Sequence, residues 1–187
     1  MRSYPSLVFA QYRDSLRSLR STSTLTTAGL LLAIQMVLSS YGVIEVTDSL
    51  KISLAHLALA PTAMLFGPVV AGMQGALSDI LGFMLKPTGP YFPGFTLTAL
   101  LGGVIYGMFF YKTRRSTWQI IAARLVIIVF VNICLNTVFL SMLYGPGQWA
   151  ALPLRAMKNF LQLPIDCVLL AAVCRAVSRI PIKPSYR

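Results

Sequence analysis

The chain has 187 residues, of which 56% are hydrophobic and 11% are charged, and its mean hydropathy is +0.72. In a soluble domain roughly a quarter of the residues are charged, so this composition excludes an ordinary soluble domain and indicates an integral membrane protein. The net charge of +11 does not indicate nucleic-acid binding, because the basic residues lie between apolar segments, where the positive-inside rule would place them.

Residues 1–23 are polar and carry four arginines, and we predict that they form a cytoplasmic amphipathic lead-in. A cleaved signal peptide would have a short apolar core followed by a small-residue cleavage site. Here the apolar run is long and continues into further spans. Residues 24–179 are predicted to form one membrane domain, and residues 180–187 a basic cytoplasmic tail.

The membrane domain is predicted to be an all-α bundle of six transmembrane helices. Their approximate ranges are Thr24–Tyr41, Ile52–Phe66, Pro68–Leu85, Phe95–Tyr111, Trp118–Tyr144 and Leu154–Arg179. A helix rises 1.5 Å per residue, so most of these segments nearly cross a hydrocarbon core about 30 Å thick. The second segment is short and contains Pro61, so the sequence leaves open whether it spans completely.

An even number of spans places both termini on the same side of the membrane. That side collects Arg2, Arg13, Arg17, Arg20, Lys112, Arg114, Arg115, Arg175, Arg179, Lys183 and Arg187, whereas Lys51, Lys86, Arg155 and Lys158 fall on the other side. The excess of basic residues predicts that both termini are cytoplasmic. Arg124, near the start of the fifth helix, is expected to snorkel to the cytoplasmic side.

With this orientation, polar residues gather in the outer half of the bundle. They are Gln35, Ser39 and Ser40 on the first helix, Asp79 on the third, Asn132 and Asn136 on the fifth, and Arg155, Lys158, Asn159 and Gln162 on the sixth. Since lipid does not solvate an ion, Asp79 must face protein or a wet cavity. This asymmetry predicts a cup that is open to the outside and closed below, although hydrogen bonds between helices are an alternative role for each amide.

The predicted lining indicates the chemistry of a ligand. Arg155 and Lys158 share a helix face at the rim and suit a carboxylate or a phosphate. The carboxylate and amides deeper in the cup suit the donor and acceptor edge of a heterocycle. Stacking faces near the mouth could come from Tyr41, Tyr91, Phe92, Phe95 and Tyr144, for which an interfacial aromatic belt is the alternative.

Other chemistry-bearing residues indicate no metal site or disulfide. The three cysteines, Cys134, Cys167 and Cys174, lie in apolar runs without CxxC spacing. His56 is the single histidine and is expected to play a hydrogen-bonded structural role. No cofactor is expected, and without a Walker A sequence the chain is not expected to hydrolyse ATP.

Four stretches carry a resemblance to a known family. They are "LFGPVVAGMQGALSDILG", "GPYFPGFTLTALLGGVIYG", "VNICLNTVFLSMLYG" and "RAMKNFLQLPID", together with the pair Gly29 and Ala33 four residues apart. On these, the chain from about Leu25 to Arg179 resembles the substrate-binding S components of bacterial energy-coupling factor (ECF) transporters, and most closely their folate family. The resemblance implies a six-helix bundle in the bacterial cytoplasmic membrane that binds a vitamin with high affinity.

The same resemblance implies partners and a coupling surface. The partners would be a T subunit and two cytoplasmic ATPases, which make the S component topple in the membrane and release its ligand inside. The family's coupling motif is two alanines spaced by three residues on the first helix, and this chain has Gly29 in the first place and Ala33 in the second. Small residues on one face also let another helix approach closely in lipid.

Folate fits the predicted cup, because its two carboxylates match Arg155 and Lys158 and its pterin presents a flat, hydrogen-bonding ring. The predicted ligand-binding residues are therefore Gln35, Asp79, Tyr91, Phe95, Asn132, Asn136, Arg155, Lys158 and Asn159. An S component for riboflavin, thiamine or pantothenate remains an alternative. An intramembrane enzyme using Asp79 and Asp166 is disfavoured because the GxGD, GxSxG and HExxH motifs are absent, and a structural membrane protein is the third possibility.

Overall fold

The computed structural model describes residues 4–41, 43–47, 50–87, 90–112 and 117–179, and it omits the side chains of residues 4–8 and 41–53. The basic tail predicted after residue 179 and the loop residues Arg114 and Arg115 lie outside this description. The elements in chain order are α1 (Tyr4–Ser18), α2 (Thr22–Tyr41), β1 (Val43–Thr47), β2 (Leu50–Ser53), α3 (His56–Phe66), α4 (Pro68–Leu85), α5 (Pro93–Phe110), α6 (Thr117–Val126), the π-helix η1 (Ile127–Leu135), α7 (Asn136–Tyr144), the 3₁₀-helix η2 (Pro146–Trp149) and α8 (Leu152–Arg179).

Five helical segments of the described chain are long and apolar enough to cross a membrane. They are Thr22–Ser40, Pro68–Leu85, Pro93–Phe110, Thr117–Tyr144 and Leu152–Arg179. The fourth comprises α6, η1 and α7 as one continuous rod. Their bounds agree with the predicted spans to within a few residues, since apolar length sets both.

The second predicted span, Ile52–Phe66, is built differently from the others. Residues 52 and 53 belong to strand β2, which pairs with β1 in an antiparallel hairpin with Ile44 opposite Ile52, so the predicted helix start at Ile52 is wrong. Helix α3 has 11 residues and is therefore about 16 Å long, roughly half the thickness of a hydrocarbon core. Every residue from Ala58 to Met64 is buried, so α3 is an internal helix surrounded by its neighbours.

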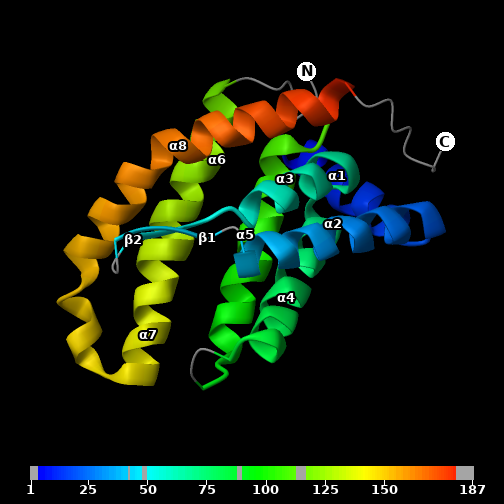
Figure 1. Ribbon diagram of the computed structural model, residues 1–187. Helices are drawn as coiled ribbons and strands as arrows, with labels where there is room; N and C mark the ends of the chain where they lie inside the picture. The colour runs from blue at the N-terminus through cyan, green and yellow to red at the C-terminus, as the bar shows by residue number, and fades with distance from the viewer. Residues whose placement is uncertain (1–3, 42, 48–49, 88–89, 113–116, 180–187) are drawn as a thin grey trace.

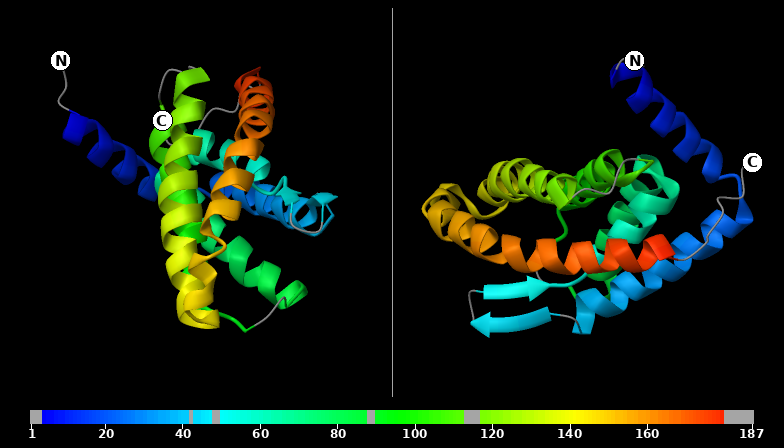
Figure 2. Two further views of the ribbon diagram at one scale, coloured as in Figure 1. Left: turned by 90° about the vertical axis from the view of Figure 1, so that its left-hand side faces the viewer. Right: turned by 90° about the horizontal axis from the view of Figure 1, so that it is seen from above.

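The helix ends sort into two groups at opposite ends of the bundle (Figures 1 and 2). At the upper end in Figure 1, helix α1 lies near the start of α4, the end of α5, the start of α6 and the end of α8. The α4–α5 connection and the turn around η2 lie at the lower end. Helix α2 crosses in front of α4 instead of running alongside it, and it packs against α3 and α4.

Glycines bring α4 and α5 into close contact. A Cβ atom added to Gly75 would meet the carbonyl oxygen of Ala99, and one added to Gly103 would meet the carbonyl oxygen of Ala71. A Cβ atom on Gly107 would likewise meet the backbone of Pro68. Gly103 and Gly107 thus let α5 approach α4 closely, and this helix pair is the wall on which the site is built.

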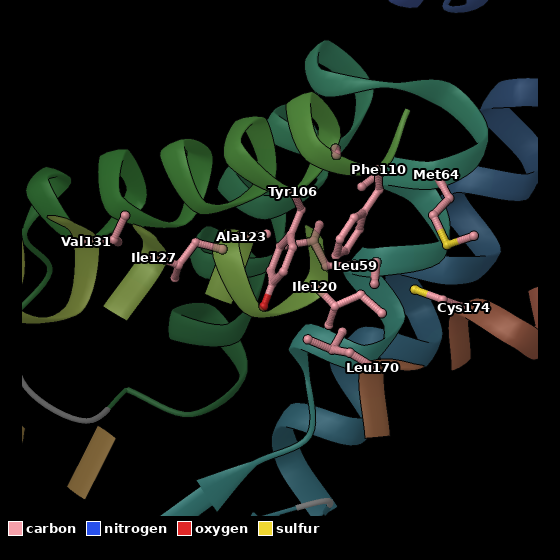
Figure 3. Packing of buried hydrophobic residues seen from close by; sticks show 13 residues of the cluster. Leu59, Met64, Tyr106, Phe110, Ile120, Ala123, Ile127, Val131, Leu170 and Cys174 are labelled. Carbon is pink, nitrogen blue, oxygen red and sulfur yellow. The ribbon is translucent and has the colours of Figure 1, made fainter. Parts of the chain in front are cut away.

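The apolar core lies between α3, α5, the α6–η1 rod and α8 (Figure 3). Its members include Leu59, Met64, Tyr106, Phe110, Ile120, Ala123, Ile127, Val131, Leu170 and Cys174. Burial on all sides of α3 explains why this helix is apolar all round without facing lipid.

Helix α1 is attached to the start of α4 through Ser15, which is fully buried. Helix α4 begins with Pro68 after Gly67, whose φ of 87° suits glycine, and no side chain of its own caps it. The hydroxyl of Ser15 accepts hydrogen bonds from the backbone N–H groups of Val69 at 3.1 Å and Val70 at 3.3 Å. Ser15 thus supplies the missing N-cap from a separate helix.

Candidate ligand-binding cavity

A cavity of about 630 Å³ lies inside the bundle, between α2, α3, α4, α5, the η1–α7 rod and the α4–α5 connection. This volume is in the range of sites that enclose a drug-sized ligand. Its polar and charged lining residues are Gln35, Ser39, Ser40, His56, Ser78, Asp79, Lys86, Thr98, Arg124, Asn132 and Asn136, and its aromatic ones are Phe83, Tyr91, Phe92, Phe95, Tyr106 and Tyr144.

The two ends of the cavity differ in exposure. At one end lie Lys86, Tyr91 and Tyr144, all of which are exposed. At the other end lie Tyr106 and Arg124, which are 2% and 7% exposed. The cavity is therefore open beside the α4–α5 connection and closed in the middle of the bundle, as expected for a cup.

Asp79 lies on the α4 wall, where the small residues Gly75 and Gly82 flank it in the lining. The hydroxyl of Thr96 donates to Asp79 Oδ2 at 2.7 Å, and the hydroxyl of Tyr91 lies 2.8 Å from that of Thr96. Since Thr96 uses its single proton toward Asp79, Tyr91 is the donor of the second bond. Asp79 Oδ1 has no hydrogen-bond partner within the described part of the chain, and Asp79 belongs to the cavity lining, so this oxygen is an unused acceptor at the cavity.

Aromatic contacts hold the α4–α5 connection at the mouth. The ring of Tyr91 lies 5.2 Å from that of Phe83, and Phe92 lies 5.8 Å from Phe95 and 5.6 Å from Phe139, measured between ring centroids. These are distances at which aromatic pairs attract one another. The predicted aromatic residues Tyr91 and Phe95 thus lie at the cavity, whereas the side chain of Tyr41 is outside the description.

Asn132 and Asn136 reach the cavity from the irregular part of the α6–η1–α7 rod. Asn132 lies within the π-helix η1 and Asn136 begins α7. π-Helical turns are rare and occur frequently at functional sites. The side-chain oxygen of Asn136 is buried and has no partner among the described residues, which leaves it available to a ligand donor.

Gln35 lines the cavity from α2 and is held by two hydrogen bonds to α4. Its Nε2 donates to the hydroxyl of Ser78 at 2.9 Å, and its Oε1 accepts from Gln74 Nε2 at 2.8 Å. Gln35 is 5% exposed. Gln35 therefore joins α2 to α4 by hydrogen bonds and lies in the cavity lining.

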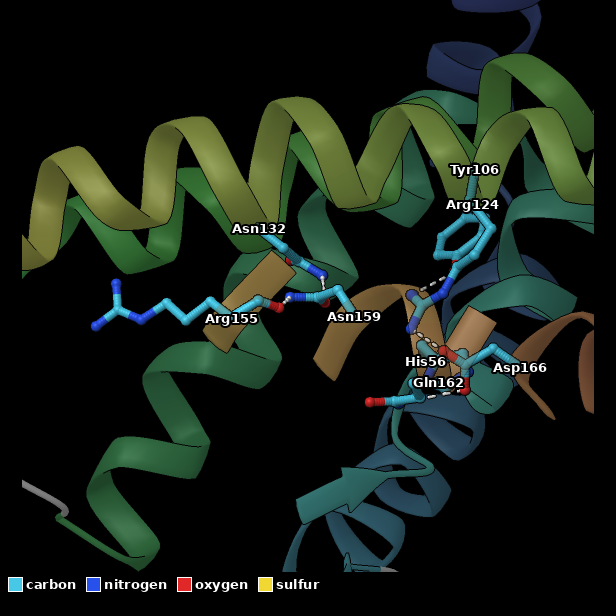
Figure 4. A network of polar contacts seen from close by, with 8 residues as sticks. All are labelled: His56, Tyr106, Arg124, Asn132, Arg155, Asn159, Gln162 and Asp166. Carbon is cyan, nitrogen blue, oxygen red and sulfur yellow. Dashed lines mark hydrogen bonds and ion pairs between the residues drawn. The ribbon is translucent and has the colours of Figure 1, made fainter. Parts of the chain in front are cut away.

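The three predicted residues of α8 are not among the residues that line the cavity. Asn159 lies directly behind the wall, where its Oδ1 accepts from Asn132 Nδ2 at 3.0 Å. The guanidinium of Arg155 donates to Gln148 Oε1 beyond the end of α7 and points away from the buried cluster in Figure 4. Lys158 is partly exposed on the same helix. The structure therefore brings Gln35, Asp79, Tyr91, Phe95, Asn132 and Asn136 together and leaves Arg155 and Lys158 outside this group.

Arg124 does not snorkel to the membrane surface, so that prediction is wrong. Its guanidinium turns into the bundle and pairs with the fully buried carboxylate of Asp166, and it donates to the Tyr106 hydroxyl at 3.2 Å (Figure 4). Gln162 Nε2 donates to Asp166 Oδ1 at 3.3 Å. His56 Nε2 also lies 3.3 Å from Asp166 Oδ1, although its alignment falls short of a good hydrogen bond. Because the carboxylate of Asp166 compensates the charge of Arg124, the guanidinium can remain buried without contact with water.

The sequence interpretation missed three residues of the lining that carry charge or titrate. Lys86 lies at the mouth, and His56 and Arg124 lie at the closed end. A signal for Arg124 existed, because intramembrane charges usually pair with one another and Asp166 is the one acidic residue of the last predicted span. Among the described residues, no cluster of three or more His, Cys, Asp or Glu side chains could hold a metal ion.

Gly29 and Ala33 lie away from the cavity on an outer face of α2. Both are exposed, and a Cβ atom added to Gly29 would meet nothing within 4 Å. Large apolar side chains continue this face at Leu25, Leu30, Ile34 and Val37, which are 43–63% exposed.

A comparison with known protein families identifies the family of this chain. The family described as "ECF transporter, substrate-specific component" matches residues 23–174, which include every lining residue. The chain belongs to this family.

The chain is similar to proteins named folate transporter FolT. The chain is 38% identical over 136 residues to the folate transporter FolT of Clostridium novyi (strain NT), covering 73% of this chain and 79% of that protein. It is 31% identical over 143 residues to FolT of Leuconostoc mesenteroides, covering 73% and 76%. A solved structure described as "Crystal structure of FolT bound with folic acid" matches with a TM-score of 0.74 and 35% identity, covering 86% of this chain and 95% of that one. As a member of the family, this chain is a multi-pass membrane protein of a transporter.

Proposed function

We propose that this S component binds folate on the outer side of the bacterial cytoplasmic membrane and delivers it inward. The main support for this proposal is the cavity of about 630 Å³, which is lined by a carboxylate, two asparagines and aromatic rings. The chain around this cavity matches the structure of FolT bound with folic acid over 86% of its length. The partners in this proposal are a T subunit and two cytoplasmic ATPases, which hydrolyse the ATP. The chain itself is then neither an enzyme nor a cofactor-bearing protein.

The chemistry of folate matches the lining of the cavity. Its pterin is flat and carries hydrogen-bond donors, which suit Asp79 Oδ1 and the amides of Asn132 and Asn136. Its glutamate carries two carboxylates, which suit cations near the mouth. Lys86 is the cation in the lining at the mouth, and Arg155 and Lys158 would contribute from α8 once the ligand or that helix brings them together.

Both termini are proposed to be cytoplasmic, with a sixth crossing made by α3 and the segment before it. In support, Arg13 and Arg17 lie on α1, Lys112 follows α5, and Arg175 and Arg179 lie near the end of α8, all at the end of the bundle that holds α1. By contrast, Lys86 follows α4, and Arg155 and Lys158 lie near the start of α8, toward the opposite end. This distribution follows the positive-inside rule. It directs the cavity mouth, beside Lys86, to the outside.

The outer face of α2 is proposed to contact the T subunit through Gly29 and Ala33. Small exposed side chains on an apolar helix let a second helix approach closely, and this contact is gained in lipid by van der Waals packing. The face is distinct from the cavity, so ligand binding and coupling should be separable by substitution.

Purified protein would test the proposal. Mass spectrometry of the small molecule that co-purifies should identify a folate, and isothermal titration with folic acid should give tight binding with one site. Riboflavin, thiamine and pantothenate serve as competitors. Tight binding of one of these and none of folic acid would replace folate by that vitamin, and turnover of a ligand without partner subunits would indicate an enzyme instead.

A further inference from the structure

The closed end of the cavity holds a cation whose donors are incompletely used. Arg124 is 7% exposed, and the structure pairs two of its nitrogens, one with Asp166 and one with Tyr106. A guanidinium has five N–H donors. Its Nε is buried and has no hydrogen-bond partner among the described residues. Since buried donors are nearly always paired, an acceptor from outside the chain is expected here.

A ligand in the cavity can bring an acceptor to the guanidinium of Arg124. The residue is part of the lining, together with Tyr106 and Ile127. Arg124 comes from α6, Tyr106 from α5 and Asp166 from α8, so three helices fix its guanidinium (Figure 4). A donor held in this way is preorganised, and little conformational entropy is lost when a ligand arrives.

The charge balance decides which kind of acceptor fits. Asp166 is fully buried against Arg124, so the pair carries no net charge. A second carboxylate from a ligand would place an uncompensated negative charge beside Asp166, which is costly in a low-dielectric interior. A neutral oxygen acceptor, such as a ring carbonyl, accepts a hydrogen bond from Arg124 without that cost.

We propose that Arg124, positioned by Asp166 and Tyr106, is the specificity-determining donor at the closed end of the cavity and binds the ring carbonyl oxygen of the ligand's heterocycle. This inference rests on the proposed function. It predicts discrimination between two ligands that differ at ring position 4, folic acid with its 4-oxo group and aminopterin with a 4-amino group in its place, a change that also removes the proton from the neighbouring ring nitrogen N3. The 4-amino group presents N–H donors to Arg124, so the hydrogen bond from the guanidinium to the 4-oxo group is lost and N–H donors of ligand and protein face each other.

The test is isothermal titration of both ligands into the purified full-length protein. The wild-type protein should prefer folic acid over aminopterin by about ten- to a hundredfold, the range expected for one hydrogen bond to a charged group. The double variant R124Q/D166N removes both charges together. Its glutamine offers an acceptor as well as a donor, so the preference for folic acid over aminopterin should fall to less than about threefold. The matched control D166N keeps the Arg124 donors and should retain the preference for folic acid even if both affinities fall.

The ratio of the two affinities separates this inference from a structural role. If Arg124 only stabilises the bundle, R124Q/D166N weakens both ligands equally, the ratio keeps its wild-type value and the inference is refuted. Equal binding of the two ligands by the wild-type protein refutes it without any variant, so the test stands even if the double variant does not fold. If the wild-type protein binds neither ligand, the proposed function itself fails.

Discussion

Replacing Asp79 by Asn tests whether this carboxylate binds the ligand or only holds the mouth of the cavity. Asp79 Oδ2 is engaged by Thr96, whereas Oδ1 has no partner in the described chain. The substitution preserves the shape of the side chain and the position of an acceptor for Thr96, but removes the negative charge from Oδ1. A hydrogen bond to a charged group contributes about 1.5–3 kcal/mol, so the affinity for folate should fall about ten- to a hundredfold.

The stability of the variant should change in the other direction or not at all. Asp79 is partly buried and has no cationic partner within 4.0 Å among the described residues, so its charge is not compensated by an ion pair. Removing an unpaired charge from a membrane span relieves its desolvation. The melting temperature of the ligand-free Asp79→Asn protein should therefore equal or exceed that of the wild type.

A matched control is Thr96→Val, which removes the hydroxyl that bridges Tyr91 to Asp79 and leaves the carboxylate in place. Isothermal titration and thermal unfolding of both variants decide between the two roles. Strong loss of binding in Asp79→Asn with a small change in Thr96→Val supports direct contact. Normal folate affinity in Asp79→Asn together with a lowered melting temperature would refute the reasoning, because Asp79 would then be a structural partner.

Further predictions concern other parts of the chain. Arg155→Ala and Lys158→Ala should each weaken folate binding about ten- to a hundredfold if they hold the ligand's carboxylates, and unchanged affinity in both titrations would exclude that role. Gly29→Trp or Ala33→Trp should leave ligand binding near wild type but abolish uptake and co-purification with the T subunit; uptake that persists would remove this face from the coupling site. Gly103→Ala should destabilise the protein by about 1–3 kcal/mol, because the new methyl group overpacks the contact between α4 and α5. Gly29→Ala is the control and should not destabilise it, because its new Cβ meets nothing within 4 Å. Equal melting temperatures of these two variants would mean that α4 and α5 separate easily.

The amino-acid sequence by itself determined the helices and most of the cavity wall. Apolar length fixed the spans Pro68–Leu85 and Trp118–Tyr144 closely, because backbone hydrogen bonds in lipid must be satisfied within a helix. The polar residues Asp79, Asn132 and Asn136 could be assigned to one cavity for a related reason. A polar side chain at membrane depth must face protein or water, and few such residues occur in this chain.

Only the tertiary structure decided which side chains face each other. The partner of Arg124 is Asp166, 42 residues away on α8, and helix periodicity does not indicate which faces of two separate helices will meet. The same holds for Arg155 and Lys158, whose helix face follows from spacing but whose distance from the cavity depends on where α8 packs. Local hydropathy therefore set the elements and their depth, whereas interhelical packing set the ion pair at the closed end and the separation of α8 from the cavity lining.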